Sequence, residues 1–435
     1  MLRVGEPCFY LDRCSLSELP ADVATAVASK RLTLQGDLQR VSFVGVILNN
    51  DSVNIFLPRS SILPSGKAQG HQVASSVMLA IEKYGRSSEK TLINQVDEGS
   101  GYKNIAQLTL LKELLTDFIQ NGIYSKRKQV RRINQGKVDW KKTVNGFNPY
   151  PSREGQPVYI DTYGVSREDF SNCEVAKIHA KVISIIDQRI SWLLLGDQRL
   201  DTAALREYQK PTGEVDYQIL QLRREIATTY SDRDIRLLRM LIDFLERLTG
   251  LNESPLVIGL TKFHFCWEAM LAKVLEFVEP VNSKLPFPVY VDIADCELPA
   301  NPSSMVTDIF MHDHARRAIA VVDAKYYAAT KASDSPRWKD IVKQLFYDQA
   351  IETLSLNTSI KNIFVFPGNE GSMKKVAVRR RALDKQGAVS FVDKFRPIYC
   401  YYVDPLAVIE NYTKNKKMAE FSTILLEEER PNLVG

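Results

Sequence analysis

Two short apolar runs joined by a polar turn constrain this chain more than any other stretch. The runs at residues 306–311 and 318–322 are each too short for a helix and bounded by polar or charged residues, which is typical of buried strands. Residues 312–317 between them are mostly polar and predict a hairpin turn. We therefore expect two strands side by side, with Asp308 near the start of the first and Asp323 at the end of the second.

The end of the second strand carries a compact group of charges. Side chains alternate along a strand, so Asp323 and Lys325 should project from one face, and the hairpin should fold Asp308 back towards them. Two carboxylates supply hard oxygen ligands for Mg²⁺, and a neighbouring cation can orient or activate an attacking water. The pattern D-x14-D-x-K matches the nuclease signature PD-(D/E)xK. The sequence predicts metal-dependent phosphodiester cleavage at these three residues.

Four sequence blocks extend this pattern into a family resemblance. They are residues 263–268 (F-H-F-C-W-E), 307–309 (T-D-I), 323–327 (D-A-K-Y-Y) and 340–347 (D-I-V-K-Q-L-F-Y). In order and spacing they resemble the LlaJI restriction endonuclease family, which is similar to McrC, the nuclease subunit of modification-dependent restriction systems. The best-matching part spans residues 263–367. Thr307 departs from the proline of the nuclease pattern, but that position shapes the strand and binds no metal.

The resemblance implies further roles at the site. An acid on the first nuclease helix faces the metal in related enzymes, so Glu268 is expected to join Asp308 and Asp323 as a metal ligand for Mg²⁺, with Mn²⁺ as an alternative ion. The alternative for Glu268 is an ordinary exposed helix acid. Gln344 is expected to orient phosphate or water, and otherwise is a surface glutamine. With Lys325, these residues form the predicted catalytic set.

Periodicity divides the chain into three expected domains of an α/β fold of the α+β multidomain kind. Residues 1–124 form a β-rich module with a hairpin at 41–58, residues 125–255 a basic linker and helical scaffold, and residues 256–435 a mixed sheet flanked by helices as the PD-(D/E)xK nuclease domain. In McrC-like proteins the N-terminal region resembles the part that docks on a motor protein. Arg59, which follows a strand ending in Leu-Pro, is then a candidate partner contact, or else a solvated arginine.

The densest basic patch begins the second segment. Tyr124 and Trp140 lie near it, so it is suited either to holding phosphates and stacking bases or to forming a solvated linker. The residues we interpret as candidate DNA contacts are Lys126, Arg127, Lys128, Arg131 and Arg132.

Composition limits the other classes of function. The net charge of +5 is modest, so attraction to nucleic acid must come from local patches. The 6 cysteines lack metal-site spacing and predict reduced thiols, and no apolar run is long enough for a membrane span, so we expect a cytoplasmic protein without membrane contact. His312 and His314 are interpreted as residues of a hydrated turn rather than metal ligands.

No phosphate-cradling G-x-x-x-x-G-K-[ST] loop occurs in the sequence, so any DNA motor must be another chain. The resemblance implies an McrB-like AAA+ GTPase hexamer that this chain binds and stimulates. The prediction is a Mg²⁺-dependent DNA endonuclease subunit of an anti-phage restriction system, of type II-like or McrBC-like kind. One such centre cuts one strand, so double-strand cleavage would need two copies. The alternatives are a repair nuclease working with a helicase, or a non-catalytic activator of a partner NTPase.

Overall fold

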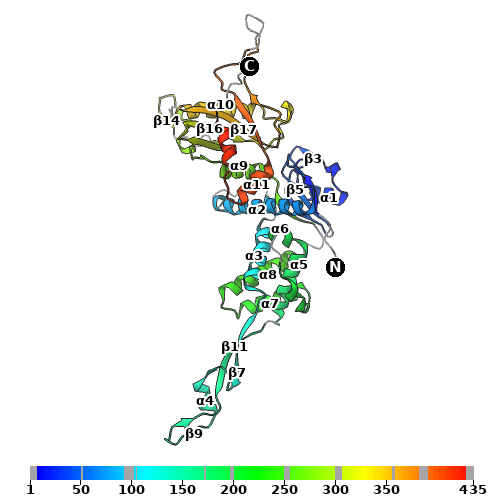
Figure 1. The fold of residues 1–435 in the computed structure, drawn as a ribbon, viewed down its shortest axis with the longest axis vertical. Coiled ribbons are helices and arrows are strands. Elements are labelled where there is room, and N and C mark those ends of the chain that lie inside the picture. The colour runs from blue at the N-terminus through cyan, green and yellow to red at the C-terminus, as the bar shows by residue number, and fades with distance from the viewer. Residues whose placement is uncertain are drawn as a thin grey trace. The chain divides into compact units, whose positions relative to one another are not determined.

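The computed structural model describes residues 7–49, 52–92, 102–103, 105–170, 173–195, 200–248, 255–298, 306–354, 358–381 and 390–427. The chain forms two compact units (Figure 1). Unit 1 comprises Met1–Leu108 and Pro255–Gly435, and unit 2 comprises Thr109–Ser254. Unit 2 is therefore an insertion in the chain of unit 1.

The first sheet of unit 1 is built on the predicted N-terminal hairpin. Both hairpin strands are fully buried and pair antiparallel, which explains their continuous apolar sequences and confirms the hairpin prediction. The helix α1 (Ala21–Ser29) packs on this sheet through a core that includes Val27 and Phe56. In sheet order the strands are β1 (Cys8–Leu11), β5 (Val53–Leu57), β4 (Val44–Leu48), β12 (Leu256–Leu260) and β6 (Tyr102–Lys103).

Two glycines allow β12 to join this sheet. Gly45 pairs with Gly259 across β4 and β12. A Cβ atom on Gly45 would lie 2.2 Å from the backbone oxygen of Ile258, and one on Gly259 would lie 2.6 Å from the Phe43 ring. The absence of both side chains lets the Phe43 ring lie over the crossing. Because the helix α9 (Phe263–Val274) follows β12 directly, this packing sets where α9 begins.

The second sheet of unit 1 is mixed, as predicted. β15 and β16 are antiparallel, β16 is parallel to β17, and β17 is parallel to β19, while the short β18 is antiparallel at the edge. The hairpin predicted at 306–322 is therefore confirmed. The strands in sheet order are β15 (Ile309–Asp313), β16 (Ala318–Ala324), β17 (Ser359–Pro367), β19 (Ile398–Val403) and β18 (Lys375–Val376).

Helices flank the second sheet (Figure 1). α10 contacts β16, β17 and β19, whereas α9 and α12 contact β16. α11, which the sequence did not predict, begins at Pro405 under an Asp404 cap and packs on α2 and α9. The bounds are α2 (Lys67–Leu92), α9 (Phe263–Val274), α10 (Trp338–Glu352), α11 (Pro405–Thr413) and α12 (Ala419–Leu426).

The predicted helical middle is confirmed in unit 2. The helix expected from residue 174 to 195 is interrupted at Ile190, which separates α5 from α6. Ser231 accepts a hydrogen bond from Asp234 N at 3.3 Å and so caps α8, as its sequence position predicted. The helices are α3 (Ile105–Asn121), whose start lies in unit 1, α5 (Glu174–Arg189), α6 (Ser191–Leu195), α7 (Val215–Ile226) and α8 (Asp232–Leu248).

The basic segment after α3 forms a strand rather than an irregular linker. β7 pairs antiparallel with β11 along its whole length, from Lys126 opposite Phe170 to Ile133 opposite Tyr163. The remaining elements of this arm are short (Figure 1). The bounds are β7 (Lys126–Ile133), β8 (Lys137–Val138), α4 (Trp140–Gly146), β9 (Tyr150–Pro151), β10 (Pro157–Val158) and β11 (Tyr163–Phe170).

Short elements complete unit 1. The strand predicted near 287–292 is reduced to β13, which pairs with β14. None of the helices in the described ranges has the length and apolar character needed to cross a bilayer. The six cysteines are free thiols. The remaining strands are β2 (Thr33–Leu34), β3 (Asp37–Val41), β13 (Tyr290–Val291) and β14 (Glu297–Leu298).

Candidate active site

The hairpin of β15 and β16 brings the two predicted aspartates together. Asp308 immediately precedes β15, and the pairing of Ile309 with Val322 places it opposite Asp323 near the end of β16. Asp308 Oδ2 also accepts a hydrogen bond of 3.3 Å from Ala324 N. Asp323 is almost completely buried, with 2% of its surface exposed. Two carboxyl groups thus meet where the strand pair ends.

Asp323 has an unusual protonation equilibrium. Burial raises its pKa to about 7, helped by the hydrogen bond and negative charge of Asp308, while Lys325 acts in the opposite direction. Both Asp323 oxygens are buried and lack a well-directed hydrogen bond from the described residues. Its strongest partner is the Lys325 ammonium, whose Nζ lies 3.0 Å from Oδ2. The negative charge of the two aspartates is therefore only partly offset by neighbouring positive charge.

Lys325 lies between two carboxylates. Its Nζ is 3.0 Å from Asp323 Oδ2 and 3.0 Å from Asp340 Oδ1. Burial alone would lower the pKa of Lys325, but these two carboxylates outweigh it and raise the pKa above its usual value. Lys325 is a charged ammonium at neutral pH, so it can orient or stabilise an anion but cannot begin as a base.

Asp340 was missed as a site residue by sequence reasoning. It opens α10 within the fourth family block, and its Oδ2 accepts from Arg337 N at 3.3 Å as part of a helix cap. Its other oxygen, Oδ1, binds Lys325 across fifteen residues of sequence. The only signal in the sequence was its position in that block, since a capping acid at a helix start is common for structural reasons alone.

Glu268 lies on α9 near the aspartate pair. Burial raises its pKa to about 7, and the charge of Asp323 adds to the effect, while Lys325 and Lys343 oppose it. In the described part of the chain, however, Glu268 does not join the two aspartates in a set whose ligand atoms all lie within 4.8 Å. Its role as a metal ligand remains a prediction.

The buried face of α9 differs from the one expected. Phe265, predicted to face the core, is 46% exposed, whereas Trp267 is fully buried. The buried series of α9 is Phe263, Cys266, Trp267, Met270, Leu271 and Val274. Both series have helical spacing, so periodicity did not distinguish them.

Gln344 and Tyr347 fasten α10 to the two strands of the site. Gln344 Nε2 donates to Val321 O at 2.7 Å, and Tyr347 Oη donates to Val306 O at 2.5 Å. Gln344 has no exposed surface, and its Oε1 lacks a hydrogen-bond partner in the described ranges. Gln344 is therefore a buried residue, and its predicted role in orienting phosphate or water remains a prediction.

A cavity of about 460 Å³ opens beside Lys325. Arg59 belongs to its wall: its backbone N donates to Tyr326 Oη at 2.9 Å and its Nη1 donates to Tyr326 O at 3.2 Å. The predicted partner contact of Arg59 remains a prediction. The lining residues are Arg13, Leu34, Arg40, Arg59, His264, Glu268, Ala324, Lys325, Tyr326 and Tyr327.

The predicted DNA contacts lie on β7 in unit 2. Lys126 forms an ion pair with Glu225, with Nζ 2.6 Å from Oε2. Arg131 and Arg132 are exposed. The side chains of Arg127 and Lys128 lie outside the described residues. DNA binding by this set remains a prediction.

His312 and His314 lie beside Glu279 rather than in a loose turn. His312 belongs to β15, and His314 Nε2 lies 2.7 Å from Glu279 Oε1. Backbone hydrogen bonds from Glu279 N to Phe310 O (3.0 Å) and from His312 N to Phe277 O (2.8 Å) hold the two segments together. The donor atoms of the three side chains all lie within 4.8 Å, close enough to share one metal ion.

Comparison with known proteins gives matches over most of the chain. A family model described as LlaJI restriction endonuclease matches residues 43–378. The chain is 27% identical over 353 residues to the type II restriction enzyme BsuMI component YdjA of Bacillus subtilis (strain 168), which covers 76% of this chain and 73% of that protein.

Two matches among solved structures come from Thermococcus gammatolerans. One is a half-complex from a tetradecameric assembly of McrB AAA+ hexamers with bound McrC, with a TM-score of 0.39 and 12% identity, covering 94% of this chain and 99% of that chain. Another is a cryo-EM structure of the McrBC complex, with a TM-score of 0.27 and 11% identity, covering 60% of this chain and 85% of that chain.

Proposed function

Because this chain belongs to the LlaJI restriction endonuclease family, we propose that it is the DNA-cleaving subunit of a restriction system. The observation that carries the proposal is the pair of buried Asp323 and half-buried Asp308, with Lys325 held against it at the end of the β15–β16 hairpin. Buried carboxylates cost stability unless a cation or hydrogen bonds compensate them, so a purely structural protein gains nothing from this arrangement.

The donor set fits a hard divalent cation, and we take Mg²⁺ as the ion, with Mn²⁺ as an alternative. Asp308 and Asp323 would hold it, with Glu268 as the nearby third carboxylate. Support comes from the oxygen-only ligands and from the two buried Asp323 oxygens that lack a well-directed hydrogen bond in the described chain. When bound, such an ion supplies charge neutralisation at the phosphate and a lower pKa for a bound water.

The protein groups around the aspartates have separate tasks in this proposal. Lys325 is an ammonium with three donors, two of which face Asp323 and Asp340, leaving one N–H for a phosphate oxygen or the attacking water. Glu268, with a pKa of about 7, can accept the proton that this water loses. Gln344 fixes β16 from behind through Val321 and so keeps Asp323 in place.

The motor for this reaction is proposed to be a separate McrB-like AAA+ GTPase. The sequence contains no phosphate-cradling loop that would bind a nucleotide within this chain. Contact with that partner is assigned to the β-rich region of residues 1–124. A double-strand break is proposed to need two copies of this chain, because each carries one D-x14-D-x-K centre.

The test is plasmid cleavage in Mg²⁺ by the full chain, with and without the candidate partner and GTP. Asp308→Asn and Lys325→Met should each lower the cleavage rate by orders of magnitude, since each removes a charge next to Asp323. Asp393→Asn, an exposed acid of the same unit, is the matched control and should cut normally. Wild-type rates in Asp308→Asn would refute the assignment of the site.

A further inference from the structure

Three arginines of the N-terminal part of unit 1 line the cavity beside Lys325. Arg13 follows β1, Arg40 belongs to β3 and Arg59 follows β5, and all three line the cavity together with Lys325. Glu268 is the single acidic residue of the lining. The wall is therefore strongly cationic, although the chain as a whole carries a net charge of only +5.

Arg13 and Arg59 are held rigidly, and each keeps an unused donor. Arg13 has a left-handed backbone (φ 74°), and its Nε lies 3.6 Å from Asp12 Oδ2, but its Nη1 is buried without a hydrogen-bond partner in the described chain. Arg59 donates hydrogen bonds from its backbone N and its Nη1 to Tyr326. Its Nε is likewise buried and has no hydrogen-bond partner among the described residues. An unsatisfied buried donor is destabilising, and neither donor is compensated within the described chain.

The neighbouring acid does not neutralise both guanidinium groups. Asp12 is buried, and its Oδ1 accepts a hydrogen bond of 3.0 Å from Phe43 N. Its single negative charge faces both Arg13 and Arg59, and the charge of Asp334 also acts on Arg59. Arg40 adds a more exposed cation, with its Nε 3.4 Å from Asp37 Oδ2.

We propose that Arg13, Arg40 and Arg59 form a binding site for a backbone phosphate of the DNA strand, adjacent to the phosphodiester cut at Asp308 and Asp323. This inference rests on the proposed nuclease function. Guanidinium groups bind phosphate through paired N–H donors, and the cavity wall contains three guanidinium groups, those of Arg13, Arg40 and Arg59. A cavity of about 460 Å³ lies within the roughly 300–1,000 Å³ of small-ligand sites, which suits a nucleotide-sized group.

The same site would couple phosphate binding to the reacting groups. Arg59 contacts Tyr326, which directly follows Lys325, and Tyr326 packs against Phe263 at the start of α9 with ring centroids 5.4 Å apart. A phosphate on Arg59 therefore fixes both the end of β16 and the helix that carries Glu268. In this proposal the N-terminal sheet forms one wall of the cleavage cleft.

The experiment measures binding of the full chain to a fluorescent 20-base-pair duplex in EDTA over a range of salt concentrations. Arg40→Gln, at a largely exposed position where folding is not at risk, should weaken binding equally for unrelated sequences. It should also reduce the slope of log K against log [salt] by about 0.9, the value for one lost phosphate contact. Arg59→Lys keeps the charge but loses the planar fork, so it should weaken binding with little change in slope.

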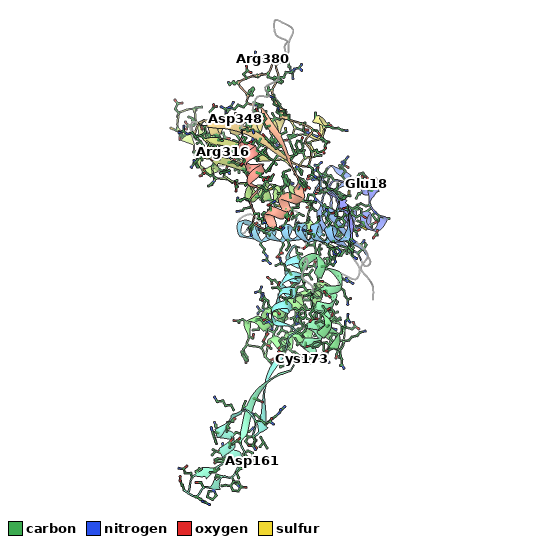
Figure 2. All side chains as sticks on the ribbon, in the orientation of Figure 1. Glu18, Asp161, Cys173, Arg316, Asp348 and Arg380 are labelled. Atoms are coloured by element: carbon green, nitrogen blue, oxygen red, sulfur yellow. The ribbon has the colours of Figure 1, made fainter. Side chains whose placement is uncertain are left out.

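Arg316→Gln is the matched control, because Arg316 lies in the β15–β16 turn (Figure 2), is half-exposed and forms an ion pair with Asp313, with its Nε 3.7 Å from Oδ2. Its salt slope should equal that of the wild type. Thermal unfolding of each variant checks that the fold is intact. Unchanged affinity and slope in both Arg40→Gln and Arg59→Lys would overturn the phosphate site.

Failure of this inference is distinguishable from failure of the proposed function. If Asp308→Asn abolishes cleavage while the arginine variants bind normally, the nuclease assignment stands and the phosphate site does not. If Arg59→Lys loses only stimulation of the partner and keeps wild-type DNA binding, Arg59 is a partner contact and the phosphate site is wrong. If Asp308→Asn cuts at the wild-type rate, the nuclease assignment itself fails.

Discussion

Mild acid should destabilise unit 2 through one buried histidine. His179 on α5 has no exposed surface, and its Nδ1 accepts a hydrogen bond of 3.1 Å from Tyr124 N. Nδ1 can accept this hydrogen bond only when the imidazole ring of His179 is neutral. Protonation would place an N–H on Nδ1, facing the N–H of Tyr124. Burial lowers the pKa of His179 to about 4, and the opposing charges of Asp117 and Arg233 change it less.

The size of the effect follows from this pKa. The difference between the usual value of 6.5 and about 4 in the folded chain corresponds to about 3 kcal/mol, at 1.36 kcal/mol per unit. Because the folded pKa is the lower one, the unfolded chain binds the extra proton in this range. The contribution of neutral His179 to the free energy of unfolding is fully present above pH 6.5 and is lost as the pH falls towards 4.

The assay is hydrogen exchange of the α5 amides, read by mass spectrometry on the full chain between pH 7 and pH 5 and corrected for intrinsic exchange rates. This readout reports on unit 2 without interference from unit 1. His179→Asn, whose side-chain oxygen can still accept from Tyr124 N, should be less stable at pH 7 but should lose the pH dependence. His314→Asn changes an exposed histidine and should retain the pH dependence of the wild type. An unchanged pH dependence in His179→Asn would refute the reasoning.

Two further predictions concern the site and the first sheet. Because the raised pKa of Glu268 is about 7 against a usual 4.5, cleavage should increase as the pH rises through 7, and Glu268→Gln should cut slowly with a smaller increase, since the pKa of Asp323 is also raised to about 7. A variant with the wild-type pH profile would exclude Glu268 as the proton acceptor. Gly45→Ala should destabilise unit 1 by about 3 kcal/mol or more, since its Cβ would lie 2.2 Å from Ile258 O. A denaturation midpoint equal to that of the wild type would contradict this account of the β4–β12 crossing.

The parts of the site that the sequence predicted correctly are those fixed by local geometry. The β15–β16 hairpin depends on two short apolar runs and a polar turn, and its register alone brings Asp308 to Asp323. The unpredicted parts depend on residues far apart in sequence. Arg59 meets Tyr326 across 267 positions, and no periodic pattern contains that information.

Two further features could not be predicted from the sequence: that the basic segment β7 is a strand, and which face of α9 is buried. β7 carries mostly basic residues, and its ladder with β11 is satisfied by backbone groups, so neither an apolar alternation nor a burial signal marked it as a strand. In α9 two apolar series have the same spacing, and the contacts with the sheets decide between them. The family blocks located the site, but packing decided which of their residues meet.

The return of the chain to the first sheet at β12 has a consequence for biosynthesis. β4 emerges from the ribosome long before its neighbour β12, with the whole of unit 2 between them. At about 5–20 residues per second, that delay is roughly 10–40 s. During this time the apolar strand β4 has an open edge, a known route to aggregation, so nascent chains should rely on chaperones or on early folding of the α1 side. The hairpin with Asp308 and Asp323 is made later still, and α10, β17 and β19 follow it, so the candidate site is complete only after those elements have also emerged.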